Sequence, residues 1–213
     1  VGLAMASLLR KRGIDVAVFE RRAGLHKQPQ AHVINTRTME VFREIGVDRR
    51  VAAAAPSMAR MRFITWSESL AGCEFGRLSL LGKDPSQALS RLAFSPVTFV
   101  NLAQNKLEPI LHSRAVELGA DVHFGHTVTD VRSYGDKATM LVRPGAGEPI
   151  EVEADFVVAC DGAGSTLRSD AGIIMEGPSS LQKFITVYFE ANLDRVLWGR
   201  PGPVHWLVGS DVR

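Results

Sequence analysis

The pattern of apolar and polar positions predicts helices and strands in alternation along the chain. Small and apolar residues at helical spacing predict a helix over Val1–Arg12, which Gly13 ends. The run Asp15–Glu20 is short, contains β-branched residues and is bounded by glycine and by charges, so it predicts a strand. A helix that leads directly into such a strand is half of a βαβ unit, and the first strand of that unit would precede Val1.

Two further helices are predicted from apolar stripes. The first covers Arg37–Glu44, with Asn35 or Thr36 as the residue that caps its N-terminus. The second covers Ala103–Leu118. Pro109 fits poorly inside this helix, because proline in a helix interior costs about 3 kcal/mol, so we expect a kink there or a helix that starts shortly before it.

The remaining apolar runs predict strands. Gly135-Asp136 is typical of a tight hairpin turn between two of them. The strands are expected at Arg60–Trp66, Asp121–Phe124, Thr127–Ser133, Ala138–Arg143, the buried run Asp155–Cys160, and Lys183–Ala191.

Composition narrows the class of protein. The 213 residues are enough for one large domain or for one and a half smaller ones, and 46% of them are hydrophobic. The net charge of +2 and the scattered basic residues argue against nucleic-acid binding. Cys73 and Cys160 lie far apart and form no CxxC pair, which favours a reducing cytosol over a disulfide framework or a metal site. No apolar run reaches the roughly 18 residues of a membrane span.

The two ends of the sequence indicate a fragment of a longer protein. The first residue is not Met, and the first residues already read as the inside of an element. The positive charges of the N-terminal stretch follow its apolar part, which is not the order of a signal peptide. We therefore expect a parent protein that continues beyond both ends.

Gly2 and Glu20 fit half of a dinucleotide-binding fingerprint. The third glycine of G-x-G-x-x-G allows close packing, and an acidic residue about 20 positions later accepts hydrogen bonds from two ribose hydroxyls. Gly2 lies at the start of the first helix, and Glu20 ends the next strand. The first two glycines would precede Val1, and any helix–strand pair with a surface glutamate gives the same pattern, so both interpretations stay open.

Arg37 occupies the first turn of its predicted helix, where the helix dipole disfavours a cation. An anion bound at this end would account for the residue, because the guanidinium would add to the free amide donors of the first turn. From composition alone, a solvated arginine is the favoured interpretation.

The stretch DFVVACDGAGSTLR, which ends at Arg168, combines a strand, a turn and a helix start. In an open α/β sheet, the strand would deliver Asp161 to the carboxyl edge, where ligands bind. Gly162 allows a tight turn, and Ser165 can cap the helix that follows. A plain capped turn explains the same residues, so this motif alone does not decide between structure and function.

Taken in order, these motifs resemble the single-component FAD-dependent aromatic hydroxylases, the group of p-hydroxybenzoate hydroxylase and phenol hydroxylase. The resemblance rests on Gly2, on Glu20-Arg21-Arg22, on NTRTMEVFREIG, on QNKLEP from Gln104 and on DFVVACDGAGSTLR. The stretch Trp66–Gly82 is more similar to the phenol and chlorophenol hydroxylases.

The resemblance implies an α/β fold: a Rossmann-like FAD/NAD(P)-binding domain of three layers, with a mostly parallel sheet and a small antiparallel sheet. An incomplete FAD-binding domain is expected over 1–177, with 57–97 reaching toward the substrate layer. The beginning of a mixed-sheet substrate-binding domain is expected over 178–213. The first two phosphate-loop glycines and a later Gly-Asp motif of the family would lie outside the chain.

The resemblance also implies roles for single residues. Glu20 would hold the adenosine ribose, Arg37 would lie by the flavin pyrophosphate, and Gln104 would contact the ribityl chain. Asp161 and its turn would support the flavin and the passage of NAD(P)H, with Arg168 bracing the turn. The residues expected to bind cofactor are Gly2, Glu20, Arg21, Arg37, Gln104, Asp161, Gly162 and Arg168.

The implied activity is that of a cytoplasmic monooxygenase. The parent protein would use NADPH or NADH, FAD and O2 to hydroxylate a phenolic or related aromatic substrate through a flavin hydroperoxide. The fragment alone is expected to be inactive. The alternatives are another flavoenzyme of the same fold, such as a halogenase or a reductase, and a truncated non-catalytic nucleotide-binding remnant.

Overall fold

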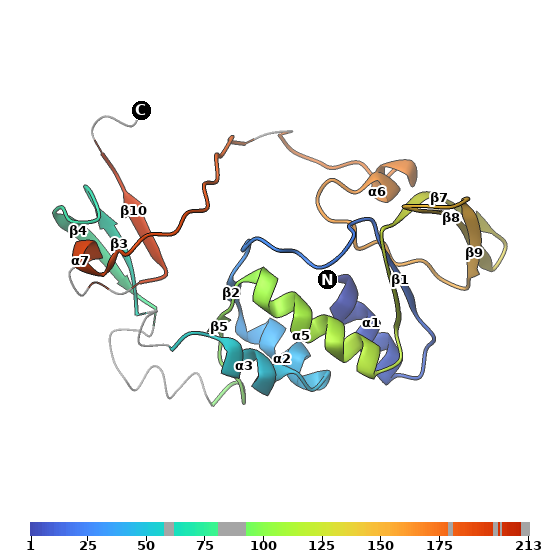
Figure 1. Cartoon of the computed structure of the whole chain (residues 1–213), viewed down its shortest axis with the longest axis horizontal. Helices are drawn as coiled ribbons and strands as arrows, with labels where there is room; N and C mark the ends of the chain where they lie inside the picture. The colour runs from blue at the N-terminus through green and yellow to red at the C-terminus, as the bar shows by residue number, and fades with distance from the viewer. Residues whose placement is uncertain (58–61, 81–92, 179–180, 198–199, 201, 210–213) are drawn as a thin grey trace. The chain divides into compact units, whose positions relative to one another are not determined.

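The computed structural model describes the chain apart from residues 58–61, 81–92, 179–180, 198–199, 201 and 210–213. The start of the strand expected at Arg60–Trp66 therefore lies outside the described residues. The chain forms two compact units (Figure 1). The first contains Val1–Gln30, Glu44–Val47 and Gln104–Lys183, and the second contains Ala31–Arg43, Asp48–Ala103 and Phe184–Arg213.

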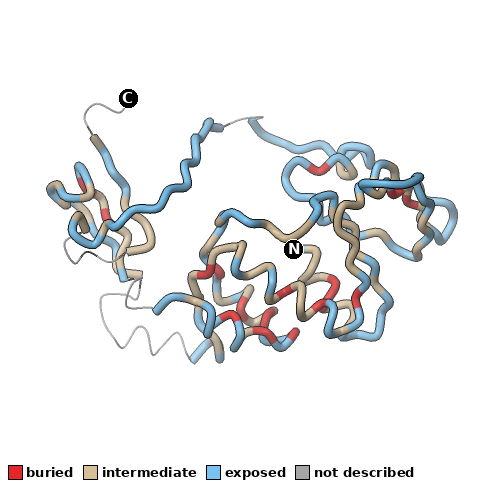
Figure 2. The backbone as a smooth tube through the Cα atoms, in the orientation of Figure 1, coloured by how far each residue is buried: buried red, intermediate tan, exposed pale blue. Residues whose placement is uncertain are grey.

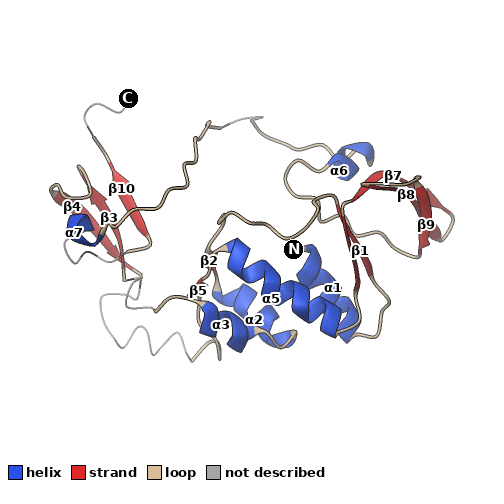
Figure 3. Ribbon diagram, in the orientation of Figure 1, coloured by secondary structure: helices blue, strands red, loops and turns tan. Residues whose placement is uncertain are grey.

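The core of the first unit is a parallel strand pair covered by two helices. Strand β1 (Ala17–Glu20) pairs in parallel with β6 (Asp121–Phe124). Helix α1 (Gly2–Lys11) packs against α5 (Gln104–Glu117) (Figure 3). The residues of this core are Ala6, Ala115 and Ala120, with Leu3, Val16, Val18 and Val122 packed against them. The small alanines allow the helices and strands to approach closely, and the helices and strands predicted here are confirmed.

Helix α5 contains Pro109 in its interior and begins at Gln104. The helix predicted over Ala103–Leu118 is therefore confirmed, and it starts five residues before the proline. Because proline has no N–H, the helix lacks one hydrogen bond at this turn. The burial of Leu111 and Ala115 on the following turn stabilises the helix in spite of this loss.

An antiparallel sheet of three strands continues the first unit. Strand β7 (His126–Tyr134) pairs with β8 (Lys137–Pro144), and β8 pairs with β9 (Ile150–Ala154). The hairpin between β7 and β8 turns at Gly135, whose φ is 62°, as its sequence predicts. Strand β9 was not predicted, because its alternating glutamates lie next to a more apolar run.

That apolar run, Asp155–Cys160, is not the buried strand that the sequence predicts. It has no strand partner among the described residues, and Phe156 is 88% exposed. Lys183–Ala191 is likewise not a strand in the structure, and Ile185 is 94% exposed. A strand is stable only when a neighbour satisfies its backbone groups, and the described residues provide none for either run. Figure 2 shows the second run as exposed backbone.

The second unit contains a helical part. Helix α2 (Thr36–Glu44) is capped by Asn35, whose Oδ1 accepts a hydrogen bond from the Thr38 amide at 2.8 Å, as predicted. Helix α3 (Asp48–Ala54) follows it. Strand β2 (Val33–Ile34) pairs antiparallel with β5 (Val100–Asn101). The buried apolar residues of this part are Ile34, Met39, Phe42, Val51 and Leu102.

A small sheet completes the second unit. Strand β3 (Phe63–Ser67) pairs antiparallel with β4 (Glu74–Ser79) and in parallel with β10 (Val204–Leu207), which follows the short helix α7 (Asp194–Leu197). The chain is thus mixed α/β with parallel and antiparallel sheets, as the resemblance implies.

Candidate cofactor-binding site

The N-terminus of α1 lies beside the segment that leads to Asp161. A Cβ atom placed on Gly2 would lie 3.7 Å from the Cβ of Cys160. No side chain caps the first turn of α1, and the turn contains no acidic residue. Its amide N–H groups are therefore donors without a side-chain acceptor, which is the arrangement that attracts a phosphate group to a helix N-terminus.

Glu20 ends β1, where the residue is half-buried and one of its two carboxylate oxygens is hydrogen-bonded. Its Oε1 accepts a hydrogen bond from the Arg22 amide at 2.9 Å, and the Arg22 carbonyl accepts one from Gly125 at 2.8 Å. In the part of the chain that the structure describes, Oε2 has no partner, so it can accept from a hydroxyl. The neighbouring Arg21 is exposed.

Asp161 is bound to the start of the helix that follows it, α6 (Thr166–Asp170). The hydroxyl of Ser165 donates to the Asp161 carboxylate and is the largest cause of the lowered pKa of Asp161, and the amides of Thr166 and Leu167 contribute. The carboxylate is exposed and ionised at neutral pH, and it shapes the turn through contacts within its own segment.

Three further features hold the same turn. Gly162 has a φ of 84°, which favours glycine. Ser165 caps α6 by accepting from the Arg168 amide at 3.0 Å, so the predicted capping role is confirmed. The Arg168 Nη1 donates to the Ala163 carbonyl at 2.9 Å and braces the turn from within.

Gln104 begins α5 and is held by Glu108, a residue for which the sequence predicts no role. Its Nε2 donates to Oε1 of Glu108 at 2.6 Å. The other oxygen of Glu108 accepts from the His26 amide at 2.8 Å. Asn105 adds a contact from its Nδ2 to the Lys27 carbonyl at 3.2 Å. Gln104 and Glu108 lie four positions apart on a helix, and residues at this spacing are neighbours on the helix surface. This spacing is the signal in the sequence that could have predicted their contact.

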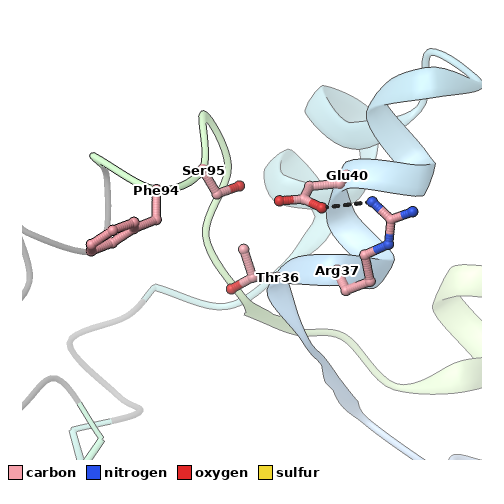
Figure 4. A pocket seen from close by; sticks show the side chains of 5 residues that line it. All are labelled: Thr36, Arg37, Glu40, Phe94 and Ser95. Atoms are coloured by element: carbon pink, nitrogen blue, oxygen red, sulfur yellow. Dashed lines mark hydrogen bonds and ion pairs between the residues drawn. The ribbon is translucent and has the colours of Figure 1, made fainter.

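Arg37 belongs to the second unit, where Glu40 provides an anionic partner. Its Nη1 lies 2.9 Å from Oε2 of Glu40, and its side chain is 80% exposed. The guanidinium is the main cause of the lowered pKa of Glu40, and a hydrogen bond with Ser95 is the second. These residues line an open pocket of about 380 Å³ together with Thr36 and Phe94 (Figure 4). The ion pair offsets the unfavourable position of Arg37 without any bound anion.

The structure thus brings Gly2 and the turn at Asp161 together in the first unit, which also holds Glu20 and Gln104.

Within the described residues, no group of three or more histidine, cysteine, aspartate and glutamate side chains could hold a metal ion. The same residues include no helix of the length and apolar character that crossing a membrane requires.

The parallel strand pair, the covering helices and the uncapped helix N-terminus are those of a nucleotide-binding α/β domain. The chain belongs to the FAD-binding domain family, whose model matches residues 1–211.

Relatives and solved structures support the same assignment. The chain is 31% identical to 2,4-dichlorophenol 6-monooxygenase of Delftia acidovorans over 99% of its length and 36% of that protein. It is 34% identical to 4-methyl-5-nitrocatechol 5-monooxygenase of a Burkholderia species over 100% of its length and 38% of that protein. It is similar, with a TM-score of 0.90, to the flavin-dependent monooxygenase PieE in complex with FAD and substrate, at 30% identity over 97% of this chain and 36% of that one.

Proposed function

We propose that the whole protein is an NAD(P)H-dependent FAD monooxygenase that hydroxylates a phenolic or related aromatic compound. The observation that carries the proposal is the similarity of nearly the entire chain, with a TM-score of 0.90, to a flavin-dependent monooxygenase that binds FAD and substrate. The names of the relatives, which include a dichlorophenol and a nitrocatechol monooxygenase, support a phenolic substrate.

The geometry of the first unit fits FAD. The free amides at the start of α1 suit a pyrophosphate, and the free Oε2 of Glu20 suits a ribose hydroxyl. Gln104 offers an amide to the hydroxyl-bearing ribityl chain, and Gly2 places the start of α1 beside the segment at Cys160. Arg21 would contribute positive charge beside Glu20.

The turn at Asp161 contributes through its shape. Gly162 and the brace from Arg168 fix the loop, and Asp161 holds its own helix start, so the loop presents a rigid edge to the cofactor and to NAD(P)H. Arg37 would add a positive charge near the pyrophosphate. Its guanidinium has several N–H donors, so it would bind a phosphate oxygen while it keeps its ion pair with Glu40.

When bound, FAD supplies the electron transfer and oxygen chemistry that no side chain provides. This chain's residues bind and orient it. The chain spans 36% of the length of the dichlorophenol monooxygenase, so we propose that the remainder of the protein forms most of the aromatic pocket.

We further propose that residues 1–177 form the FAD-binding domain and that residues 178–213 begin the substrate-binding domain. The exposed apolar residues of the second segment are consistent with packing against a further surface of the whole protein. The two free and exposed cysteines are consistent with the proposed cytoplasmic location.

The test is to purify the whole protein, measure its FAD content and follow NADPH and NADH oxidation with a panel of phenols. Bound FAD and phenol-stimulated oxidation support the proposal. Halogenated product, or reduction without oxygen uptake, would assign another flavoenzyme, and a colourless protein that does not bind added FAD would identify a non-catalytic remnant.

A further inference from the structure

The carboxylate of Glu108 connects two separate parts of the first unit. Its Oε1 lies 2.6 Å from Nε2 of Gln104, and its Oε2 lies 2.8 Å from the backbone nitrogen of His26. His26 belongs to the loop that follows β1, whereas Gln104 and Glu108 lie on α5. Asn105 and Lys27 add a second link between the same helix and loop. Glu108 is half-buried, so both contacts are partly shielded from water.

The chemistry of this arrangement fixes the orientation of the Gln104 amide. An ionised carboxylate has only acceptors, and the backbone of His26 offers only a donor at this point. Glu108 therefore faces two N–H donors and receives both as a carboxylate. The NH2 group of Gln104 must face Glu108, so the Gln104 carbonyl oxygen points elsewhere as an acceptor.

We propose that Glu108 is a positioning residue of the cofactor site. It sets Gln104 as a hydrogen-bond acceptor toward a hydroxyl of the flavin's ribityl chain, and it holds the loop after Glu20 against α5. The part of this inference that concerns FAD rests on the proposed function, whereas the link between loop and helix does not.

An isosteric change at Glu108, which replaces the carboxylate with an amide and removes its charge, separates the two contacts. Glu108→Gln has one acceptor and one donor group. If its oxygen keeps the His26 amide, its NH2 faces Gln104, which must then turn its carbonyl inward and present NH2 to the ligand. If the oxygen instead faces Gln104, the His26 contact is lost. Either outcome removes one of the two proposed effects.

The exchange of the two side chains restores both effects. In the double variant Gln104→Glu/Glu108→Gln, the new glutamate accepts from the NH2 of the new glutamine. The glutamine oxygen is then free to accept from His26, and the second oxygen of the glutamate remains an acceptor toward the ligand. The net charge is unchanged. Glu117→Gln is the matched control, since Glu117 lies at the other end of α5 and pairs with Ser113 and Arg114.

The experiment titrates FAD into the apo form of the whole protein and follows flavin fluorescence, with amide exchange at His26 measured in the same apoproteins. If Gln104 turns in Glu108→Gln, FAD binding is expected to weaken by about ten-fold, the scale of one charge-assisted hydrogen bond. If the His26 contact is lost instead, exchange at His26 is expected to accelerate. Glu108→Ala is expected to weaken FAD binding at least as much and to accelerate exchange at His26. The double variant is expected to bind FAD like the wild type, and Glu117→Gln is expected to change neither quantity.

Wild-type FAD affinity together with wild-type exchange at His26 in Glu108→Gln would overturn the proposal. So would a double variant that does not restore the quantity lost in the single one. If Gln104→Ala binds FAD normally, the role of Gln104 and the positioning of its amide are overturned while the proposed function stands. A wild-type protein that binds no FAD would overturn the proposed function as well. Unchanged exchange at His26 in Glu108→Ala would overturn the link between loop and helix.

Discussion

Gly162 and Gly164 offer a matched pair for testing how the turn after Cys160 is built. Gly162 has a φ of 84°, whereas Gly164 lies outside the left-handed region, and a Cβ on either residue would meet no atom within 4 Å. Space is therefore equal at the two positions, and only backbone conformation differs. The pair isolates the cost of the left-handed conformation.

The magnitude follows from two opposing effects. An alanine in the left-handed region costs about 1–2 kcal/mol. Replacing glycine by alanine also restricts the unfolded chain, which stabilises the folded state by about 0.4–1 kcal/mol. Gly162→Ala is therefore expected to lower the free energy of unfolding by about 1 kcal/mol, whereas Gly164→Ala should leave it unchanged or raise it slightly.

The assay is urea unfolding of the whole protein and of both variants, together with amide exchange at Ser165, whose N–H donates to the Gly162 carbonyl at 3.2 Å. Faster exchange and lower stability are expected only for Gly162→Ala. Equal effects of the two substitutions would show that the turn does not depend on the conformation of Gly162.

Three further predictions follow from contacts at the site. Arg37→Ala should weaken FAD retention, measured as flavin lost on gel filtration, and unchanged occupancy would remove Arg37 from the site. Gly2→Ala should be tolerated, because its Cβ would lie at an ordinary 3.7 Å from Cys160, whereas Gly2→Leu should displace that segment and weaken FAD binding; equal affinities in a titration would contradict this. The lowered pKa of Asp161 means that its contribution to stability is complete above its ordinary value of 3.8 and is lost as pH falls through the lower folded value. Amide exchange at Thr166 and Leu167, whose N–H groups contribute to the lowered pKa of Asp161, should therefore accelerate in acid. Asp161→Asn should remove this acid dependence, and a wild-type-like pH profile in the variant would refute it.

The sequence predicted those elements whose stability comes from local signals or from contacts within the described residues. The helix at α2 has its cap at Asn35, and the hairpin at Gly135 has a turn sequence that specifies its geometry. The strand β1 was predicted from its short β-branched run, and its partner β6 lies in the same unit. In each case the pattern in the sequence and the surroundings in the structure agree.

The two wrong strand predictions have a common cause. Both runs, Asp155–Cys160 and Lys183–Ala191, are apolar enough for a strand in a sheet. A hydrophobic pattern indicates that a segment favours burial, but it does not indicate that a neighbouring strand is present to pair with it. The described residues offer neither run a neighbouring strand, so both lie exposed.

The candidate site was predicted in part. The capping role of Ser165 and the bracing by Arg168 are visible in the structure, while the binding roles of Glu20 and Gln104 remain predictions. Glu108 was missed, because a glutamate on a helix surface is common and only the structure shows that both of its oxygens are engaged. The partner of Arg37 was missed for the same reason, since Glu40 lies one turn away on the same helix.

The most direct test of the account is to supply the purified whole protein with NADPH or NADH, a phenol and isotopically labelled O2, and to analyse the product by mass spectrometry. We expect a hydroxylated phenol that carries one labelled oxygen atom and forms only when FAD is bound. Oxidation of the nicotinamide without labelled product for any phenol in the panel, or an unlabelled hydroxyl group, would contradict it.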